Sequence, residues 1–419
     1  MLKIACAKVD ITPDASGWIG FIAAPAKLPP RDPLFGRLFL LEDDTKSTLL
    51  VSLDYGGLYL SAQDDWREEL AAAMDIPVNR VILHCVHQHD TPFVCIEAFK
   101  AYDPAVDLSW FDKVRRNVKA AALTLKDKLQ SVARIGWSET RVYGYASNRR
   151  VPMPDGSIAV RFSRCGDPAV KNKPVGIIDP MLRTLGFYGN DGKMIAAWSF
   201  YGTHPQVANT GERFGADAPG EAMRLLETTQ AGVVHSLFNG CFGNVTAGKY
   251  SGDDLEENIR VFGKKLADAI TLNTQAMETV EADSFDWQQE VFDFPAREFT
   301  EADYERLGKH HFTLPLAMRC ASEYGIKRGN KYAVEMLKLG AVKLFFVDGE
   351  LFSEYAVFAQ SLAADQKLAI VGNCGDTCFY IGTAEALSNP EGYEVNSFCR
   401  VKPEFEETFK NTLRKMLAE

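Results

Sequence analysis

The sequence predicts a mixed α/β fold in which central, partly antiparallel β-sheets are flanked by helices. Short apolar runs recur along the whole chain, hairpin-type turns join some of them, and segments with a helical apolar period lie between them. Strands and helices that mix in this way are typical of α/β or α+β proteins. With 419 residues and no repeat or linker, the chain is expected to form a single domain over 1–419.

Several apolar runs have the length and composition of buried strands. They lie at 48–55, 80–85, 181–189, 194–202, 232–240, 341–349 and 367–373. The segment GNDGK at 189–193 separates two of these runs with residues typical of a hairpin turn, and MPDGS at 153–157 has the same character. The sheets are therefore predicted to be at least partly antiparallel.

Helical signals are found between and after these strands. Segment 110–128 comes directly after Ser109, which together with Asp112 has the S-x-x-D pattern of a capping box. Segment 254–272 places its apolar residues on one helical face. Segment 403–417 begins with a proline, a residue that is favoured in the first turn of a helix. We expect these helices to cover the sheets.

Charge and composition exclude several classes of protein. Lys and Arg number 46 against 56 Asp and Glu, which gives a net charge of −10 without a basic block, so nucleic acid is not an expected partner. The N-terminus lacks the apolar run of a signal peptide, and no stretch approaches the ~20 apolar residues that cross a bilayer. We expect a cytoplasmic protein without a stable membrane anchor, whose partner is a small-molecule substrate. The oligomeric state stays open.

The cysteines agree with this compartment. The chain has nine of them, an odd number, and they are scattered without paired C-x-x-C spacing. We therefore expect reduced thiols that mostly lie in the core.

The first candidate site is VILHCVHQHDTP at 81–92, which holds three of the seven histidines. Alternate residues of a strand share a face, so His87 and His89 are expected to project together and His84 to the other side. Neutral imidazole is a common zinc ligand, and the pair therefore predicts a metal site. Two histidines that are hydrogen-bonded in the core would leave the same pattern, and the motif alone does not separate these readings.

Two further strand ends carry suitable ligands. In SFYGTHPQ (199–206), His204 follows an apolar strand and precedes a proline. In FVDGELFSEYAVF (346–358), Glu350 stands between a buried strand and a helical segment. By themselves, His204 is explained by a structural role and Glu350 by the dipole of the helix that follows it.

The chain has a series of segments that occur in the same order in one family of enzymes. They are AKVDITP (7–13), LLVSLDYGGL (49–58), VHQHDTP (86–92), SNRR (147–150), SFYGTHP (199–205), GADAPGEA (215–222), FNGCFGNVTAG (238–248), VDGELFSEY (347–355) and YIGTAEA through EGYEV (380–395). On these segments the chain resembles the N-terminal catalytic domain of the neutral, or alkaline, non-lysosomal ceramidases. The resemblance implies the mixed α/β fold of that domain. We expect the C-terminal immunoglobulin-like domain and the secretion signal of the ceramidases to be absent.

The resemblance also implies a metal centre that holds one Zn²⁺ per chain. On the positions that match the family's motifs, the ligands are His87, His204, Glu350 and Tyr380. Two imidazoles, a carboxylate and a phenol are nitrogen and oxygen donors that satisfy zinc and leave a position for water.

Two catalytic residues follow from the same resemblance. His89 matches the second histidine of the family's H-x-H, and Arg149 matches an arginine; both are taken to stabilise the developing oxyanion. Zinc lowers the pKa of its bound water towards ~7 and polarises an amide carbonyl. The implied reaction is therefore the hydrolysis of a C–N bond in an N-acyl compound. A metal-dependent esterase or lactonase, and a metal-retaining binding protein without activity, remain the alternatives.

The motifs depart from the family at two places. Where the family has H-T-H-S-G-P, this chain has HQHDTP at 87–92, which puts the extra carboxylate of Asp90 beside the histidines. Where the family has G-D-V-S-P, whose serine has been proposed as a nucleophile, this chain has Thr246 in the serine's place. Asp54 and Asp217, each at a predicted strand end or turn, are expected to orient the ligand imidazoles.

The substrate is expected to be small and soluble. The segment 13–36 is rich in proline and glycine and has no clear period, as binding loops often do. We expect Trp18, Phe21 and Phe35 to form an apolar lid over an acyl or ring group, and Asp90 to suit a substrate with hydroxyl or amino groups. A net charge of −10 and the lack of a basic amphipathic helix disfavour a membrane lipid such as ceramide.

Overall fold

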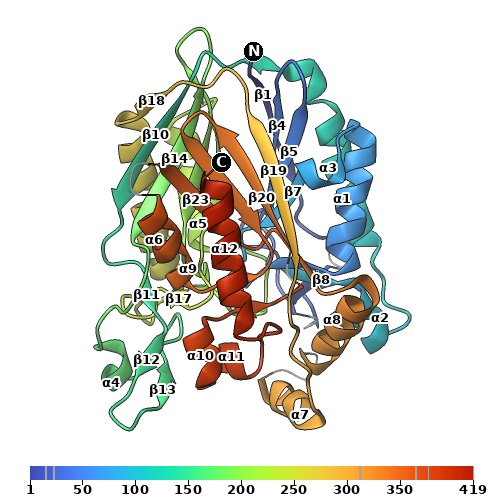
Figure 1. The fold of residues 1–419 in the computed structure, drawn as a ribbon, viewed down its shortest axis with the longest axis vertical. Coiled ribbons are helices and arrows are strands. Elements are labelled where there is room, and N and C mark those ends of the chain that lie inside the picture. The colour runs from blue at the N-terminus through green and yellow to red at the C-terminus, as the bar shows by residue number, and fades with distance from the viewer. Residues whose placement is uncertain (15–16, 22–23, 311–313, 364–365, 376, 419) are drawn as a thin grey trace.

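The computed structural model describes the whole chain except residues 15–16, 22–23, 311–313, 364–365, 376 and 419. The architecture is mixed α/β with partly antiparallel sheets, as the sequence predicts. In Figure 1 the long strands run close to the long axis of the molecule, and helices lie outside them.

The first sheet has two covered faces. Its strand order is β7 (Val81–Cys85), β5 (Ser47–Leu53), β4 (Phe35–Glu42), β1 (Lys3–Asp10) and β9 (Gln130–Ser131). These neighbours are antiparallel except β5 and β7, which run parallel. Helices α1 (Ser61–Met74) and α3 (Ser109–Leu123) pack on its outer face.

The second sheet repeats this arrangement. Its strand order is β16 (Val234–Asn239), β15 (Met194–Tyr201), β14 (Met181–Tyr188), β10 (Arg134–Arg141) and β18 (Glu278–Val280). Strands β15 and β16 are parallel, and the other pairs are antiparallel. Helices α5 (Asp217–Thr229) and α6 (Leu255–Gln275) cover its outer face.

The third sheet has four strands in the order β19 (Asp286–Asp293), β20 (Lys331–Leu339), β21 (Val342–Val347) and β23 (Lys367–Val371). The pair β21 and β23 is parallel. Helices α9 (Ser353–Leu362) and α12 (Glu404–Ala418) pack on it.

The inner faces of the three sheets share one hydrophobic core. Phe39 of β4 and Trp198 of β15 stack edge to face at 5.3 Å between ring centroids, and Phe346 of β21 belongs to the same cluster. Large buried aromatic side chains contribute much of the apolar area that holds a core together. The shared core fixes the three sheets relative to one another, and thereby fixes the loops at their ends.

Short elements complete the fold at the ends of the sheets. The strands are β2 (Trp18–Phe21), β3 (Ala24–Pro25), β6 (Gly57–Tyr59), β8 (Pro92–Cys95), β11 (Ser147–Asn148), β12 (Arg150–Pro152), β13 (Ile158–Val160), β17 (Val245–Thr246), β22 (Glu350–Leu351) and β24 (Tyr380–Ile381). The helices are α2 (Ile96–Tyr102), α4 (Pro168–Lys171), α7 (Glu301–His310), α8 (Leu314–Arg328), α10 (Ala384–Ser388) and α11 (Tyr393–Asn396), with single 3₁₀ turns at Val78–Arg80 and Lys126–Lys128.

The seven predicted strands and both hairpins lie where the sequence predicts them, and the strand ends differ by at most two residues. The three predicted helices are also confirmed, as α3, α6 and α12, although α3 ends at Leu123 and not at 128. Asp254 caps α6 by accepting the Glu257 N–H at 3.0 Å. The capping box predicted for α3 is wrong. Ser109 is the first residue of α3 rather than its cap, and its N–H donates to Asp107 Oδ1 at 2.9 Å.

The cysteines are free thiols, and most of them are buried, as predicted. None of the described helices is both long enough and apolar enough to span a membrane.

Candidate metal centre

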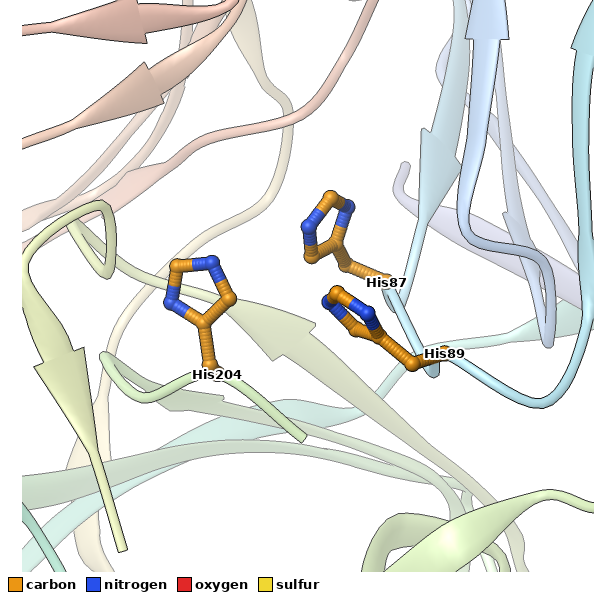
Figure 2. A group of neighbouring side chains, drawn as sticks. All are labelled: His87, His89 and His204. Atoms are coloured by element: carbon orange, nitrogen blue, oxygen red, sulfur yellow. The ribbon is translucent and has the colours of Figure 1, made fainter. Parts of the chain in front are cut away.

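Three histidines from distant parts of the sequence meet at the end of the sheets. His87 and His89 follow β7, and His204 follows β15 (Figure 2). One ring nitrogen from each can be chosen so that all three lie within 4.8 Å of one another. Strands β7 and β15 each have a parallel neighbour, and the ends of parallel strands are places where loops commonly form ligand sites.

The chain leaves strand β7 before it reaches His87. Strand β7 ends at Cys85, and His87 has φ 74°, a left-handed conformation that is uncommon outside glycine. Its N–H donates to Tyr55 O at 2.8 Å, which helps to hold this conformation. The two histidines do lie close together as expected, but not because they share one face of a strand. They face each other, with ring centroids 5.2 Å apart, because the chain turns at His87.

Backbone carbonyls orient both imidazoles that are predicted as metal ligands. His87 Nδ1 lies 2.5 Å from Gly56 O, and His204 Nδ1 lies 3.0 Å from Phe242 O and 3.1 Å from Val245 O. A carbonyl oxygen only accepts, so each Nδ1 carries the proton and each Nε2 has a free lone pair. Burial lowers the pKa of His87 to about 4 and that of His204 well below its usual range, so both rings are neutral at neutral pH.

Glu350 in β22 brings a carboxylate to the same point. Its Oε2 lies 2.9 Å from His204 Nε2 and 3.6 Å from His87 Nε2. Burial raises the pKa of Glu350, an effect that the nearby His87 and Arg149 partly oppose. Two imidazole lone pairs and a carboxylate oxygen thus converge at one point, an arrangement that a bound cation would stabilise. Tetrahedral zinc ligands are about 3.3 Å apart, so these separations fit a metal ion.

Tyr380 and Arg149 border this group of acceptors. Tyr380 Oη lies 3.4 Å from His204 Nε2, and β24, which carries Tyr380, pairs directly with β22 at Glu350. Arg149 Nη1 also lies 3.4 Å from His204 Nε2, while its Nε donates to Glu394 at 2.8 Å and its Nη2 donates to Gly243 O at 2.6 Å. The guanidinium is therefore fixed by two bonds and directs its third nitrogen towards the site.

The metal centre lies at one side of a cavity of about 490 Å³ that is mostly apolar and aromatic. Its walls are formed by Ile19, Gly20, Tyr59, His87, His89, Phe93, Phe162, Gln206, Asn209, Thr210, Gly211, Leu314, Glu350, Phe379, Tyr380, Tyr393 and Phe398. This is the volume of a pocket for a small organic ligand. The described lining has no Lys, Arg or Asp, so the carboxylate among the lining residues is that of Glu350 in the metal centre.

Thr246 lies outside this cavity lining. Its hydroxyl donates to Arg161 O at 2.9 Å and accepts the N–H of Gly248 at 3.2 Å. The hydroxyl is thus engaged by the backbone, and a nucleophilic role for Thr246 has no support in these contacts.

The three aspartates predicted near the site, Asp54, Asp90 and Asp217, form hydrogen bonds to loop residues and not to the histidine rings. Asp54 accepts from Gln88, the residue between the two histidines of the H-x-H, at 3.1 Å and forms a buried ion pair with Arg37. Asp217 accepts the N–H of Ala208 at 2.6 Å, and burial raises its pKa to about 7. The expectation that Asp54 and Asp217 orient ligand imidazoles is corrected by these contacts, because backbone carbonyls occupy the Nδ1 atoms.

Asp90 ties the H-x-H turn to the loop that forms one wall of the cavity. It accepts the N–H groups of Thr210 and Gly211 at 2.7 and 2.9 Å and the Thr210 hydroxyl at 3.0 Å. The carboxylate is fully buried and is not part of the described cavity lining. Asp90 therefore positions the cavity wall and does not contact a substrate as expected.

Replacing Asp90 with alanine should lower the free energy of unfolding by more than about 2 kcal/mol, since each buried donor left without an acceptor costs roughly 1–3 kcal/mol. Chemical denaturation measures this change. Asp191→Ala is the matched control, because Asp191 accepts one backbone N–H in an exposed turn, and its loss should cost less than about 0.5 kcal/mol. Equal effects of the two substitutions would show that the hydrogen bonds of Asp90 do not contribute to the free energy of unfolding.

The predicted lid is only partly where it was expected. The segment 13–36 reaches the cavity through Ile19 and Gly20. Trp18 packs on Phe99 of α2 at 5.3 Å, and Phe35 lies in β4 beside Lys8, so neither covers the cavity. The side chain of Phe21 lies outside the described residues.

Several residues of the site carry no role in the sequence prediction. Glu394, fully buried, forms an ion pair with Arg149 at 2.8 Å, and Tyr393 lies under the same guanidinium at 5.1 Å. Gln206 contacts His89. A buried arginine requires a carboxylate partner, so the existence of such a partner for Arg149 could have been predicted. The sequence has no signal that identifies Glu394 as that partner.

Comparison with known proteins finds this fold among ceramidases. A structure described as a ceramidase complexed with C2 matches with a TM-score of 0.74 and 17% identity, over 99% of this chain and 74% of that chain. The crystal structure of the neutral ceramidase from Pseudomonas aeruginosa matches with a TM-score of 0.74 and 18% identity over the same shares. No protein-family model matches the sequence, and no curated protein matches it. The fold is that of the neutral ceramidases, as the sequence motifs imply.

Proposed function

We propose that the protein is a metal-dependent hydrolase that cleaves the C–N bond of N-acyl compounds. The observation that carries this proposal is the convergence of His87 Nε2, His204 Nε2 and Glu350 Oε2 beside an apolar cavity. Zinc is the proposed metal, with one ion per chain and Tyr380 as the fourth protein ligand. The likeness to ceramidase structures supports an amide substrate.

Each part of the site has a role in such a reaction. When bound, zinc supplies Lewis acidity, which polarises a carbonyl group and makes a water molecule more acidic. Arg149 Nη1 and His89 border the space beside the three acceptor atoms, where they can donate hydrogen bonds to a carbonyl oxygen that becomes negative. The proposed nucleophile is water, because the Thr246 hydroxyl is bonded to backbone groups.

The proposed substrate is small, uncharged and soluble, and the proposed compartment is the cytoplasm. The absence of Lys, Arg and Asp from the described cavity lining disfavours substrates with a charged group away from the reacting bond. Phe93, Phe379 and Phe398 offer an apolar surface for an acyl or ring group.

A comparison of matched short-chain and long-chain N-acyl substrates tests this proposal. We expect kcat/KM for small N-acyl compounds to exceed that for long-chain ceramide in detergent, and activity to fall on chelation and return with zinc. A ceramide value at least about tenfold higher, or some 1.4 kcal/mol in transition-state binding, would instead make ceramide the preferred substrate.

The same panel separates the two alternatives. Hydrolysis of esters or lactones without hydrolysis of amides would identify an esterase on the same metal centre. Full metal occupancy without turnover of any substrate would leave a binding protein.

A further inference from the structure

Glu394 is a fully buried carboxylate that two consecutive arginines share. Its Oε1 accepts a hydrogen bond from Arg149 Nε at 2.8 Å, and its Oε2 accepts one from Arg150 Nη1 at 3.2 Å. The side chain of Glu394 has no exposed surface, and that of Arg149 is 1% exposed. A guanidinium group only donates and an ionised carboxylate only accepts, so the direction of both bonds is unambiguous.

The contacts of Arg149 leave one of its nitrogens for the metal centre. Its Nε is bound by Glu394, and its Nη2 donates to Gly243 O at 2.6 Å. The guanidinium group is planar, so these two bonds together fix its plane and the direction of Nη1, which lies 3.4 Å from His204 Nε2. Loss of the bond at Nε would leave Nη2 as the hydrogen-bonded end, about which the group can turn.

The backbone around Glu394 is held close to this ion pair. Glu394 is the second residue of α11 (Tyr393–Asn396), and Arg297 donates to two backbone carbonyls of this turn at 3.1 and 2.9 Å. Gly392 precedes the turn with φ 87°. A Cβ at Gly392 would lie 2.5 Å from Arg150 Nη1 and 2.9 Å from Glu394 Oε2. Glycine at this position therefore allows the chain to bring the carboxylate up to both arginines.

We propose that Glu394 is a positioning residue, which holds Arg149 so that Nη1 can meet the negative charge that develops on the substrate. Glu394 is not part of the described cavity lining, and arginines bind both of its oxygens. It therefore acts through Arg149 and not on the substrate. Its effect on turnover rests on the proposed function, whereas its placement of the guanidinium does not.

Stability alone is a weak explanation for this buried group. Charges that leave water lose hydration energy that a salt bridge often fails to recover, and apolar residues of similar volume can pack as well or better. A cation that must stay at a fixed place beside the metal centre, by contrast, requires a buried acceptor to hold it. Glu394 meets that requirement because its own backbone is fixed from the other side by Arg297.

Glu394→Asp tests the proposal, because it keeps the negative charge and shortens the side chain by one methylene group. The carboxylate then reaches less far towards Arg149, and Nη1 should be displaced. A misplacement of roughly 1 Å can cost about 10²-fold in rate, so kcat on a short-chain N-acyl substrate should fall by about that factor. Zinc content should stay the same, and KM should change less than kcat, because the displaced contact belongs to the transition state.

A double-mutant cycle with Arg149→Lys separates positioning from a general structural effect. Lysine lacks the fixed third nitrogen, so in this background Glu394→Asp should lower kcat further by less than about threefold. Glu335→Asp is the matched control. It shortens another buried carboxylate, which pairs with Arg67 at 3.2 Å and is not part of the described cavity lining, so kcat should not change.

Arginine labelled with ¹⁵N at Nε reports the contact without turnover. The Arg149 signal is identified by its loss in Arg149→Lys, and spectra are recorded on the full chain, without metal and loaded with zinc sulfate. In the native protein this N–H should exchange with solvent at least about tenfold more slowly than that of the exposed Arg164, because it is buried and bonded to Glu394. In Glu394→Asp the resonance should shift and the exchange should become faster.

Fast exchange of the Arg149 Nε–H in the native protein would overturn the proposal, even if the variant does not fold. An unchanged kcat in folded Glu394→Asp would also overturn it, as would an equal fall of kcat in the native and Arg149→Lys backgrounds. If the exchange rates agree with expectation but the native protein hydrolyses no amide, the placement of Arg149 by Glu394 stands and the proposed hydrolase function fails.

Discussion

His204→Ala is expected to lose most of the metal that the native protein carries, which should be about one zinc ion per chain when purified without added zinc. His87→Ala should lose metal to a similar extent. The reason is that each substitution removes one of the Nε2 lone pairs that converge with Glu350 Oε2. Elemental analysis after gel filtration measures the content, and a thermal melt shows whether each variant is folded.

The matched control for this experiment is His89→Gln. His89 lies in the same cluster of three histidines, but the resemblance assigns it to the developing oxyanion and not to the metal. This variant should therefore keep its metal. Full occupancy in folded His87→Ala and His204→Ala would refute the metal assignment. Loss of metal from His89→Gln would place His89 among the ligands.

Arg149→Ala should lower kcat by about 10²–10³-fold, the range for loss of one oxyanion donor. The Nη1 of Arg149 lies at the edge of the metal centre, and its proposed partner is charge that develops only in the transition state. Metal content should stay the same, because Arg149 supplies no ligand. Steady-state kinetics on a short-chain N-acyl substrate, together with elemental analysis, test both statements.

The alanine variant also leaves the buried Glu394 without its closest partner, at a cost of roughly 3–5 kcal/mol for a broken buried pair. Arg149→Lys keeps a positive charge near Glu394 but loses the fixed third nitrogen, so kcat should still fall in a stable protein. Arg150→Lys is the control, since Arg150 pairs with the other carboxylate oxygen of the same Glu394 at 3.2 Å. An unaltered kcat in folded Arg149→Lys would mean that Arg149 serves only the ion pair.

Much of the fold follows from local patterns in the sequence. The predicted apolar runs mark strands β5, β7, β14, β15, β16, β21 and β23 of the three large sheets, because a strand that is buried on both faces needs apolar residues at nearly every position. The turn residues at 189–193 and 153–157 correctly predict two antiparallel hairpins. The start of α3 is predicted to within one residue, but its capping box is wrong, because Ser109 is already the first helical residue and its N–H donates to Asp107 of the preceding loop.

The residues of the site were predicted with less uniform success than the strands and helices. His87, His204 and Glu350 each stand at the end of an apolar run, a local signal that can be read without a structure. Tyr380 and Arg149 were named only through the resemblance to a family, since neither has a distinctive local pattern. Gln206 and Glu394 were not identified, because a hydrogen-bond partner or a buried counter-ion is chosen by proximity in space.

The sequence by itself determined which elements form, which chemical groups stand at their ends, and that nitrogen and oxygen donors suited to zinc are among them. Only the tertiary structure decided how those donors are used. The shared core of the three sheets brings the ends of β7, β15 and β21 together, and backbone carbonyls then set the proton positions on the His87 and His204 imidazoles. Histidine has no intrinsic preference strong enough to fix its tautomer, so the partner of the second ring nitrogen fixes it. That partner comes from a distant segment in each case.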